Sequence, residues 1–196
     1  MLNAIVLISG SGSNLQALID KSHNKSINIK AVISNNENAF GLKRAKDANI
    51  KTYVINNKLA SNEFDLQLIE IINKYSTNLI ILAGFMRILS ADFVSKFYGK
   101  IINIHPSLLP KFTGLDTHKR AIEAGEKEHG ATVHFVTADL DMGPIIMQAK
   151  VKVKKDDKVK ILANRVLKEE HKLYPKVVKL FSENKISLQK EKVKIL

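Results

Sequence analysis

Short apolar runs alternate with amphipathic segments through the first half of the chain. The runs predict five β-strands, at residues 4–8, 29–34, 51–55, 78–83 and 100–104. Residues 4–8 are continuously apolar, as in a strand that is buried on both faces of a parallel sheet. Helical spacing of apolar residues predicts helices between the strands, at residues 15–21, 40–48, 64–75 and 90–97. Ser90 is a favoured N-cap residue for the last of these helices.

The second half of the chain is less regular. Residues 105–115 contain two prolines and a glycine, which predicts a loop, and a helix over residues 117–124 ends at Gly125. Strands follow at residues 131–136 and 144–153. A long helix is predicted over residues 158–181, with an interruption expected near Pro175. No repeat or linker divides the sequence, so we expect a single domain over residues 1–196.

This alternation of strands and helices predicts an α/β fold. We expect an open, mostly parallel twisted sheet with helices on both faces, of the Rossmann-like type. Ligands of such sheets bind at the carboxyl ends of the strands. That rule directs attention to residues 9–14, to residues 84–89 and to the segment from Asn103 onward.

Composition limits the classes of protein that fit. The 196 residues are 45% hydrophobic, which suffices for one domain with a sizeable core. The chain has no cysteine, which excludes disulfides, thiolate metal sites and a catalytic thiol, and we expect no metal. The apolar start ends at Ser9, too early for a secretory signal. The longest apolar stretch, residues 79–86, is far below the roughly 18 residues of a membrane-spanning helix. We therefore expect a cytoplasmic protein that does not contact membranes.

The formal net charge of +12 raises the question of nucleic-acid binding. Only Arg44, Arg87, Arg120 and Arg165 are arginines, the residue type best suited to bidentate contacts with bases and phosphates. The lysines are spread along the chain, with concentrations at residues 150–160 and near the C-terminus. A solvated surface or attraction of anionic ligands explains them better than nucleic acid does. We expect small-molecule substrates, and the sequence leaves open a monomer or a homodimer.

A glycine-rich turn, Ser9-Gly-Ser-Gly-Ser-Asn14, joins the first strand to the first helix. Free N–H groups and the positive end of the helix dipole suit a phosphate there. Position 15 is Leu rather than the third glycine of a dinucleotide fingerprint, and no acidic residue ends the second strand. A single phosphate fits this turn better than NAD, and a tight turn that only caps the helix is the alternative.

Asn103 and His105 lie two residues apart at the end of the fifth strand, so both side chains point to the same face. An amide can donate a hydrogen bond to a developing oxyanion, and an imidazole can exchange a proton near neutral pH. Taken alone, an Asn-x-His pair is more often a polar strand end with a buried, hydrogen-bonded histidine. The residues that surround this pair carry more information.

The string Asn103-Ile-His-Pro-Ser-Leu-Leu-Pro110 resembles the signature of the folate-dependent formyltransferases. The opening Ser-Gly-Ser-Gly-Ser-Asn-Leu-Gln-Ala resembles the members that act on glycinamide ribonucleotide. Further strings that look like those members begin at Ala83, Val133, Asp139 and Glu170. The resemblance follows the order of the motifs along nearly the whole chain.

The resemblance implies an activity and a catalytic trio. Members of this group move the formyl group of N10-formyltetrahydrofolate, a cosubstrate, to the amine of glycinamide ribonucleotide in purine biosynthesis. Asn103, His105 and Asp141 match their catalytic residues. Asn103 and protonated His105 would stabilise the oxyanion. Asp141 would favour the charged imidazole and hold a water that relays a proton to the leaving folate nitrogen. A turn-forming Asp is the alternative for Asp141.

The resemblance also implies two sets of binding residues. The residues that would bind glycinamide ribonucleotide are Gly12, Ser13 and Asn14 at the phosphate and Glu170 near the ribose and glycinamide. The residues that would bind folate are Met86, Arg87, Ile88 and Leu89, Asn103, and the loop Ala138, Asp139, Leu140 and Asp141. Glu170 as a solvated charge, and Ile88 and Leu89 as core residues, are the alternatives.

Three positions depart from the family pattern. Ser61-Asn-Glu63 stands where bacterial members commonly have an Arg, Asp116 where many have a His, and Leu167 where a polar phosphate contact is common. Two relatives compete. Methionyl-tRNA formyltransferase normally has a second, basic C-terminal domain, for which we expect no room before Leu196. Formyltetrahydrofolate hydrolase usually has an N-terminal regulatory domain and a His where this chain has Pro106. A catalytically silent phosphate-binding or nucleic-acid-binding module is disfavoured by the intact trio.

Overall fold

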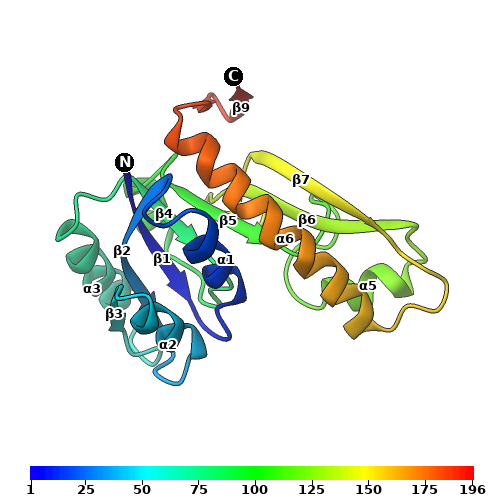
Figure 1. Ribbon diagram of the computed structural model, residues 1–196, viewed down its shortest axis with the longest axis horizontal. Coiled ribbons are helices and arrows are strands. Elements are labelled where there is room, and N and C mark those ends of the chain that lie inside the picture. Colours follow the sequence, from blue (N-terminus) through cyan, green and yellow to red (C-terminus); the bar gives the residue numbers. More distant parts are fainter.

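A seven-stranded sheet forms the centre of the molecule in the computed structural model, which describes residues 1–196. The strand order is β3-β2-β1-β4-β5-β6-β7 (Figure 1). Strands β1 to β5 pair in parallel, whereas β6 and β7 are antiparallel to their neighbours. The bounds are β1 Leu2–Ile8, β2 Ile27–Ser34, β3 Lys51–Val54, β4 Leu79–Leu82, β5 Ile101–His105, β6 Glu128–Phe135 and β7 Ile145–Lys152.

Helices cover both faces of this sheet, as predicted. One apolar cluster joins the sheet to α1 (Ser13–Lys21), α2 (Phe40–Asp47) and α6 (Val159–Ser182). A second cluster joins the other face to α3 (Ser61–Asn73) and α4 (Ala91–Lys96). The short helix α5 (Thr117–Glu123) packs near α6. The central strands β1 and β4 are therefore buried on both faces, which explains their continuous apolar runs.

The structure confirms the α/β class and every strand and helix expected from the apolar pattern, with bounds that differ by a few residues. The Ser90 hydroxyl accepts a hydrogen bond from the Phe93 N–H at 3.1 Å, so this residue is the N-cap of α4. The last residues form a hairpin, β8 (Ile186–Gln189) and β9 (Lys192–Ile195), which apolar periodicity does not single out. Its Ile186, Leu188 and Val193 pack against the core cluster that contains α6.

The interruption expected at Pro175 is absent, because α6 continues through it as one helix of 24 residues. A proline lacks an N–H, which leaves the carbonyl four residues earlier without its helical partner. That carbonyl belongs to His171, and it accepts a hydrogen bond from Lys21 Nζ on α1 at 2.8 Å. Pro175 itself is buried among the side chains of α6. The neighbouring helix thus supplies the donor that the proline lacks.

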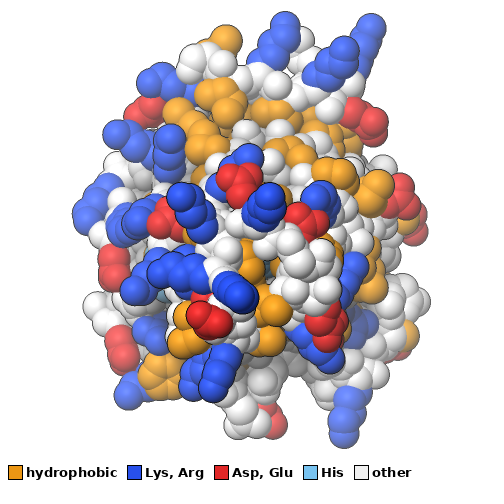
Figure 2. Space-filling view, turned by 90° about the vertical axis from the view of Figure 1, so that its right-hand side faces the viewer, with side chains coloured by type: hydrophobic (Ala, Val, Ile, Leu, Met, Phe, Trp, Pro, Cys, Tyr) orange, Lys and Arg blue, Asp and Glu red, His pale blue; other side chains and the backbone are white.

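On the face drawn in Figure 2, surface charge is dispersed rather than gathered into one block. Figure 2 shows the end of the molecule at the right of Figure 1, where Lys and Arg side chains alternate with Asp and Glu and with apolar groups. Several lysines of the chain are paired with carboxylates, such as Lys111 with Glu126 at 2.7 Å and Lys150 with Glu128 at 2.9 Å. None of the helices combines the length and the apolar character needed to cross a membrane.

Candidate active site

The glycine-rich turn and the loop after β4 lie side by side at the carboxyl edge of the sheet, because β1 and β4 are paired neighbours. Gly12 begins α1 with φ of 68°. A Cβ at this position would come 2.5 Å from the Cα of Gly41, so both the left-handed conformation and the close backbone approach require glycine. The first N–H groups of α1, at this turn, have no partner within the helix.

Asn14 and Glu170 connect α1 to α6 beside this turn. Asn14 Nδ2 donates to Glu170 Oε2 at 2.6 Å, and both residues are buried. Burial raises the pKa of the Glu170 carboxyl above its ordinary value, although the Asn14 hydrogen bond opposes the shift. Asn14 Oδ1 is buried and has no hydrogen-bond partner. The four residues assigned to glycinamide ribonucleotide therefore lie together where α1 meets α6: Gly12, Ser13, Asn14 and Glu170.

A cavity of about 540 Å³ opens between the loop after β4, the end of β5 and the segments around residues 114–119 and 136–141. Every residue assigned to the trio or to folate lines it: Met86, Arg87, Ile88, Leu89, Asn103, His105, Ala138, Asp139, Leu140 and Asp141. Met86, Ile88 and Leu140 are more than half exposed, so their apolar side chains are available to a ligand. Leu89 is only 7% exposed and also belongs to the core cluster around α3 and α4.

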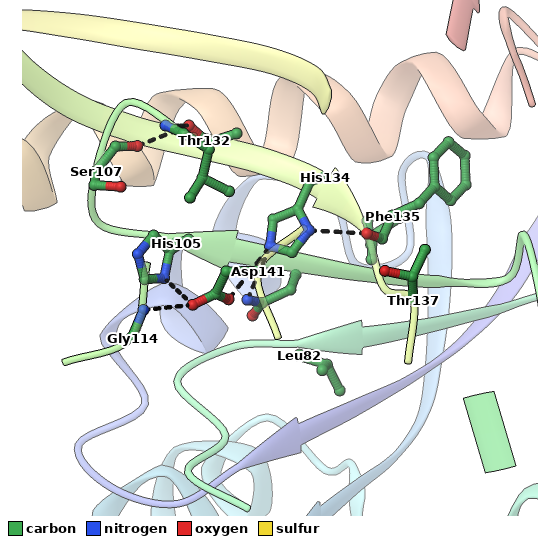
Figure 3. A network of polar contacts seen from close by, with 12 residues as sticks. Leu82, His105, Ser107, Gly114, Thr132, His134, Phe135, Thr137 and Asp141 are labelled. Carbon is green, nitrogen blue, oxygen red and sulfur yellow. Dashed lines mark hydrogen bonds and ion pairs between the residues drawn. The ribbon is translucent and has the colours of Figure 1, made fainter. Parts of the chain in front are cut away.

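His105 and Asp141 are buried side by side at the wall of this cavity (Figure 3). His105 Nδ1 lies 3.3 Å from Asp141 Oδ2, and His105 Nε2 lies 2.8 Å from the carbonyl oxygen of Phe112. Both partners are acceptors, so only the doubly protonated imidazole donates to each of them. Asp141 Oδ2 also accepts the Gly114 N–H at 2.9 Å. The geometry therefore gives His105 an acceptor at each ring nitrogen, with the Asp141 carboxyl group on the Nδ1 side.

His134 is a further polar residue of this site to which sequence reasoning gave no role. Its Nδ1 donates to the carbonyl of Phe135 at 2.8 Å, which leaves the lone pair on Nε2. Burial lowers the pKa of His134, so the neutral form is favoured. Asn103 Nδ2 lies 3.2 Å from that Nε2 and donates to it. Asn103 and His134 are paired residues of β5 and β6, so the antiparallel register places the His134 ring opposite the Asn103 amide.

Thr132 holds the loop that follows His105. Its hydroxyl donates to the carbonyl of Ser107 at 2.7 Å and accepts from the Leu109 N–H at 3.1 Å and from Gln148 Nε2 at 2.8 Å. The peptide bond between Leu109 and Pro110 is cis. Strands β6 and β7 thereby fix the loop of residues 106–112, which carries the Phe112 carbonyl to His105.

The structure also places the three departures from the family pattern. Asp116 lines the cavity at φ of 56°, directly before α5. Ser61 is the exposed first residue of α3, and it does not line the cavity. Leu167 is half-buried on α6, one turn before Glu170. None of the three contacts the trio through a hydrogen bond.

Arg87 differs from the neighbouring residues of its loop. It lines the cavity, and its guanidinium donates to the carbonyls of Asn57 and Leu59 at 2.7 and 2.9 Å. The side chain is thus engaged with the segment between β3 and α3.

Comparison with known proteins gives one consistent answer. The formyl transferase family matches residues 2–178. The phosphoribosylglycinamide formyltransferase of Escherichia coli strain K12 is 48% identical over 191 residues, which covers 95% of this chain and 90% of that protein. The solved phosphoribosylglycinamide formyltransferase of Coxiella burnetii superposes with a TM-score of 0.95 at 47% identity, covering 99% of this chain and 93% of the other. The glycinamide ribonucleotide transformylase 1 of Symbiobacterium toebii has a TM-score of 0.96 at 42% identity, covering 100% and 94%.

Proposed function

This chain belongs to the formyl transferase family, and from that premise we propose that it transfers the formyl group of N10-formyltetrahydrofolate to the amine of glycinamide ribonucleotide. The products are formylglycinamide ribonucleotide and tetrahydrofolate, in the purine biosynthesis that its relatives serve. The observation that carries the proposal is the buried His105–Asp141 pair with Asn103 beside it, at the wall of a cavity large enough for the formyl donor.

Two different regions of the chain would bind the two substrates. The cavity has the size and the largely apolar walls of a site for a flat heterocycle, and backbone groups of residues 86–89 can bond the edge of a pterin. The turn of residues 12–14 supplies N–H groups for the phosphate of the ribonucleotide. Glu170 and the unpaired Asn14 Oδ1 supply acceptors for its hydroxyl and amide groups. Asn103 and His105 lie where the formyl carbon and the amine would meet.

The proposed reaction is a direct transfer between the two substrates, assisted by Asn103, His105 and Asp141. The amine attacks the formyl carbon, a C–N bond forms, and the carbonyl oxygen becomes an oxyanion. Asn103 retains one amide hydrogen beyond its bond to His134, and it donates that hydrogen to the oxyanion. The charge on His105 stabilises the same oxygen, and direct donation from Nε2 requires opening of its bond to the Phe112 carbonyl. The bond from carbon to N10 breaks, and the amine proton passes to N10 through a water held by Asp141.

An absorbance assay with three acceptors tests the proposal. The purified protein is supplied with N10-formyltetrahydrofolate and with glycinamide ribonucleotide, initiator methionyl-tRNA or water alone. We expect release of tetrahydrofolate only with glycinamide ribonucleotide. Formylation of the tRNA alone, hydrolysis alone or no turnover with any acceptor would each refute the substrate assignment. The cytoplasmic location, the single domain and the monomeric or dimeric state stay predictions from the sequence.

A further inference from the structure

Ser9 lies between the two binding segments and bonds to the folate side. Its hydroxyl accepts the Met86 N–H at 2.7 Å, and its own N–H donates to the Gly84 carbonyl at 3.0 Å. The hydroxyl hydrogen goes to Asn35 Oδ1 at 2.6 Å. One serine at the end of β1 therefore holds both the first and the third residue of the segment 84–86. Met86 is the first residue of the segment assigned to folate.

The chain of hydrogen bonds continues from Asn35 to the far end of the same loop. Asn35 Nδ2 donates to Asn57 Oδ1 at 3.0 Å, and Arg87 Nη1 lies 3.3 Å from that oxygen. The Arg87 guanidinium also bonds the carbonyls of Asn57 and Leu59. Its central carbon lies 4.3 Å from the centroid of the buried Phe64 ring, a cation–π contact.

We propose that Ser9, Asn35, Asn57 and Arg87 are positioning residues that together fix the backbone of residues 86–89 for the formyl donor. The inference rests on the proposed function, because it takes residues 86–89 as the folate-binding segment. It assigns Arg87 a role distinct from ligand contact: the fork of its guanidinium joins two carbonyls of the β3–α3 connection, with the ring of Phe64 beneath it. No charge of Arg87 needs to reach the folate.

The glycine-rich turn has anchors that do not depend on the Ser9 hydroxyl. The Gly41 N–H donates to the Gly10 carbonyl at 3.0 Å, and Arg44 Nε donates to the Ser11 carbonyl at 2.9 Å. The Met86 N–H, by contrast, has the Ser9 hydroxyl as its partner. Loss of that hydroxyl therefore loosens the folate segment and leaves the turn for the ribonucleotide in place.

The Ser9→Ala variant tests the first half of the network. We expect the KM for N10-formyltetrahydrofolate to rise about tenfold, because a backbone N–H and Asn35 Oδ1 lose their partner together. The KM for glycinamide ribonucleotide and kcat should stay within about twofold of wild type, because the glycine-rich turn is held by hydrogen bonds that do not involve the Ser9 hydroxyl. Ser9→Thr keeps the hydroxyl and should restore the folate KM. Ser95→Ala, at an exposed residue of α4 whose side chain forms no hydrogen bond, is the matched control.

Arg87 variants separate positioning from charge attraction. Arg87→Met should raise the folate KM in the same direction, and Arg87→Lys should resemble Arg87→Met, because an ammonium cannot reproduce the planar fork. A Lys variant with the wild-type KM would show that the charge itself attracts the folate, which overturns the positioning role.

Amide hydrogen exchange gives a readout that does not depend on the reaction. In the ligand-free protein, Ser9→Ala should accelerate exchange of the Met86 amide about tenfold, as expected when its hydrogen bond is lost. If the wild-type protein shows no formyl transfer, the proposed function is refuted, but the exchange rate of the Met86 amide can still be measured and interpreted. An active wild type combined with unchanged exchange and an unchanged folate KM in Ser9→Ala would refute the network.

Discussion

Replacement of Asp141 by Asn removes a negative charge from the site and preserves its shape. In the structure Asp141 Oδ2 faces both the His105 ring and the Gly114 N–H. An Asn oxygen in that place accepts from both donors, while its NH2 group takes the position of Oδ1, 3.8 Å from His134 Nε2. The variant therefore tests the charge on Asp141 rather than the hydrogen bonds around it.

The distance between His105 and Asp141 allows the expected loss of activity to be calculated. Two unit charges at the 3.3 Å between His105 Nδ1 and Asp141 Oδ2 attract by roughly 5 kcal/mol at an effective dielectric constant of about 20. The retained neutral hydrogen bond offsets about 1 kcal/mol of that loss, so about 4 kcal/mol is the most that the charge can contribute. We expect kcat to fall by about a hundredfold, which corresponds to about 2.7 kcal/mol of activation free energy. The KM values for both substrates should change little.

The measurement is the initial rate of formyl transfer to glycinamide ribonucleotide at saturating concentrations of both substrates. Circular dichroism and thermal unfolding check that the variant is folded. Asp156→Asn, on the connection between β7 and α6, is the control for loss of one negative charge outside the cavity. A folded Asp141→Asn enzyme that keeps more than a third of the wild-type kcat would remove the charge of Asp141 from the mechanism.

Three further predictions concern other parts of the structure. Glu170→Gln should raise the KM for glycinamide ribonucleotide about tenfold without lowering the melting temperature, because burial already raises the pKa of that carboxyl and makes its ionised form costly to the fold. Burial lowers the pKa of His129 from the ordinary 6.5 to about 4. As the pH falls, His129 therefore becomes protonated in the unfolded chain at a higher pH than in the folded protein. The free energy of unfolding should be at its full value above about pH 6.5 and fall by about 2 to 3 kcal/mol toward pH 4, as urea unfolding can measure. Lys21→Met should destabilise the protein by about 1 kcal/mol, since the His171 carbonyl loses its donor, and Pro175→Ala should reduce that loss by restoring a helical N–H.

Matched controls make these three results decisive. Glu169→Gln, on the neighbouring residue, should leave the KM for glycinamide ribonucleotide unchanged. A His129→Gln protein that keeps the entire pH dependence of stability would contradict the assignment to His129. Lys176→Met, at an exposed lysine next to Pro175, should not affect stability. A Lys21→Met loss of equal size with and without Pro175→Ala would mean that the carbonyl contact is not its cause.

The parallel half of the fold is the part that the sequence predicts well, for a physical reason. Strands such as residues 4–8 are buried on both faces, so they are apolar throughout, and the helices between them must bury one stripe each. The antiparallel pairing of β6 and β7 is a property of strand direction, which local periodicity does not contain. The β8–β9 hairpin is short and only half-buried, so its apolar pattern is weak.

In the candidate site too, local features can be predicted from the sequence, whereas contacts between distant segments cannot. Asn103 and His105 share a face because they lie two apart on one strand, which the sequence alone can tell. Asp141 reaches His105 only through the fold, and its assignment depended on resemblance. His134 meets Asn103 through the β5–β6 register, so its orienting role requires knowledge of which strands pair. The sequence indicates only that His134 lies in a string that resembles the family, and it does not indicate what the side chain does.

The bond between Asn14 and Glu170 has a consequence for how this architecture can diversify. It joins α1 to α6 on one face of the sheet, while the cavity that we propose for the formyl donor is lined by the loops after β4, β5 and β6. On the proposed function, substitutions where α1 meets α6 would alter binding of the acceptor and leave the lining of the donor cavity unchanged. Specificity for the donor of the one-carbon unit and specificity for its acceptor can therefore evolve at different positions of this fold.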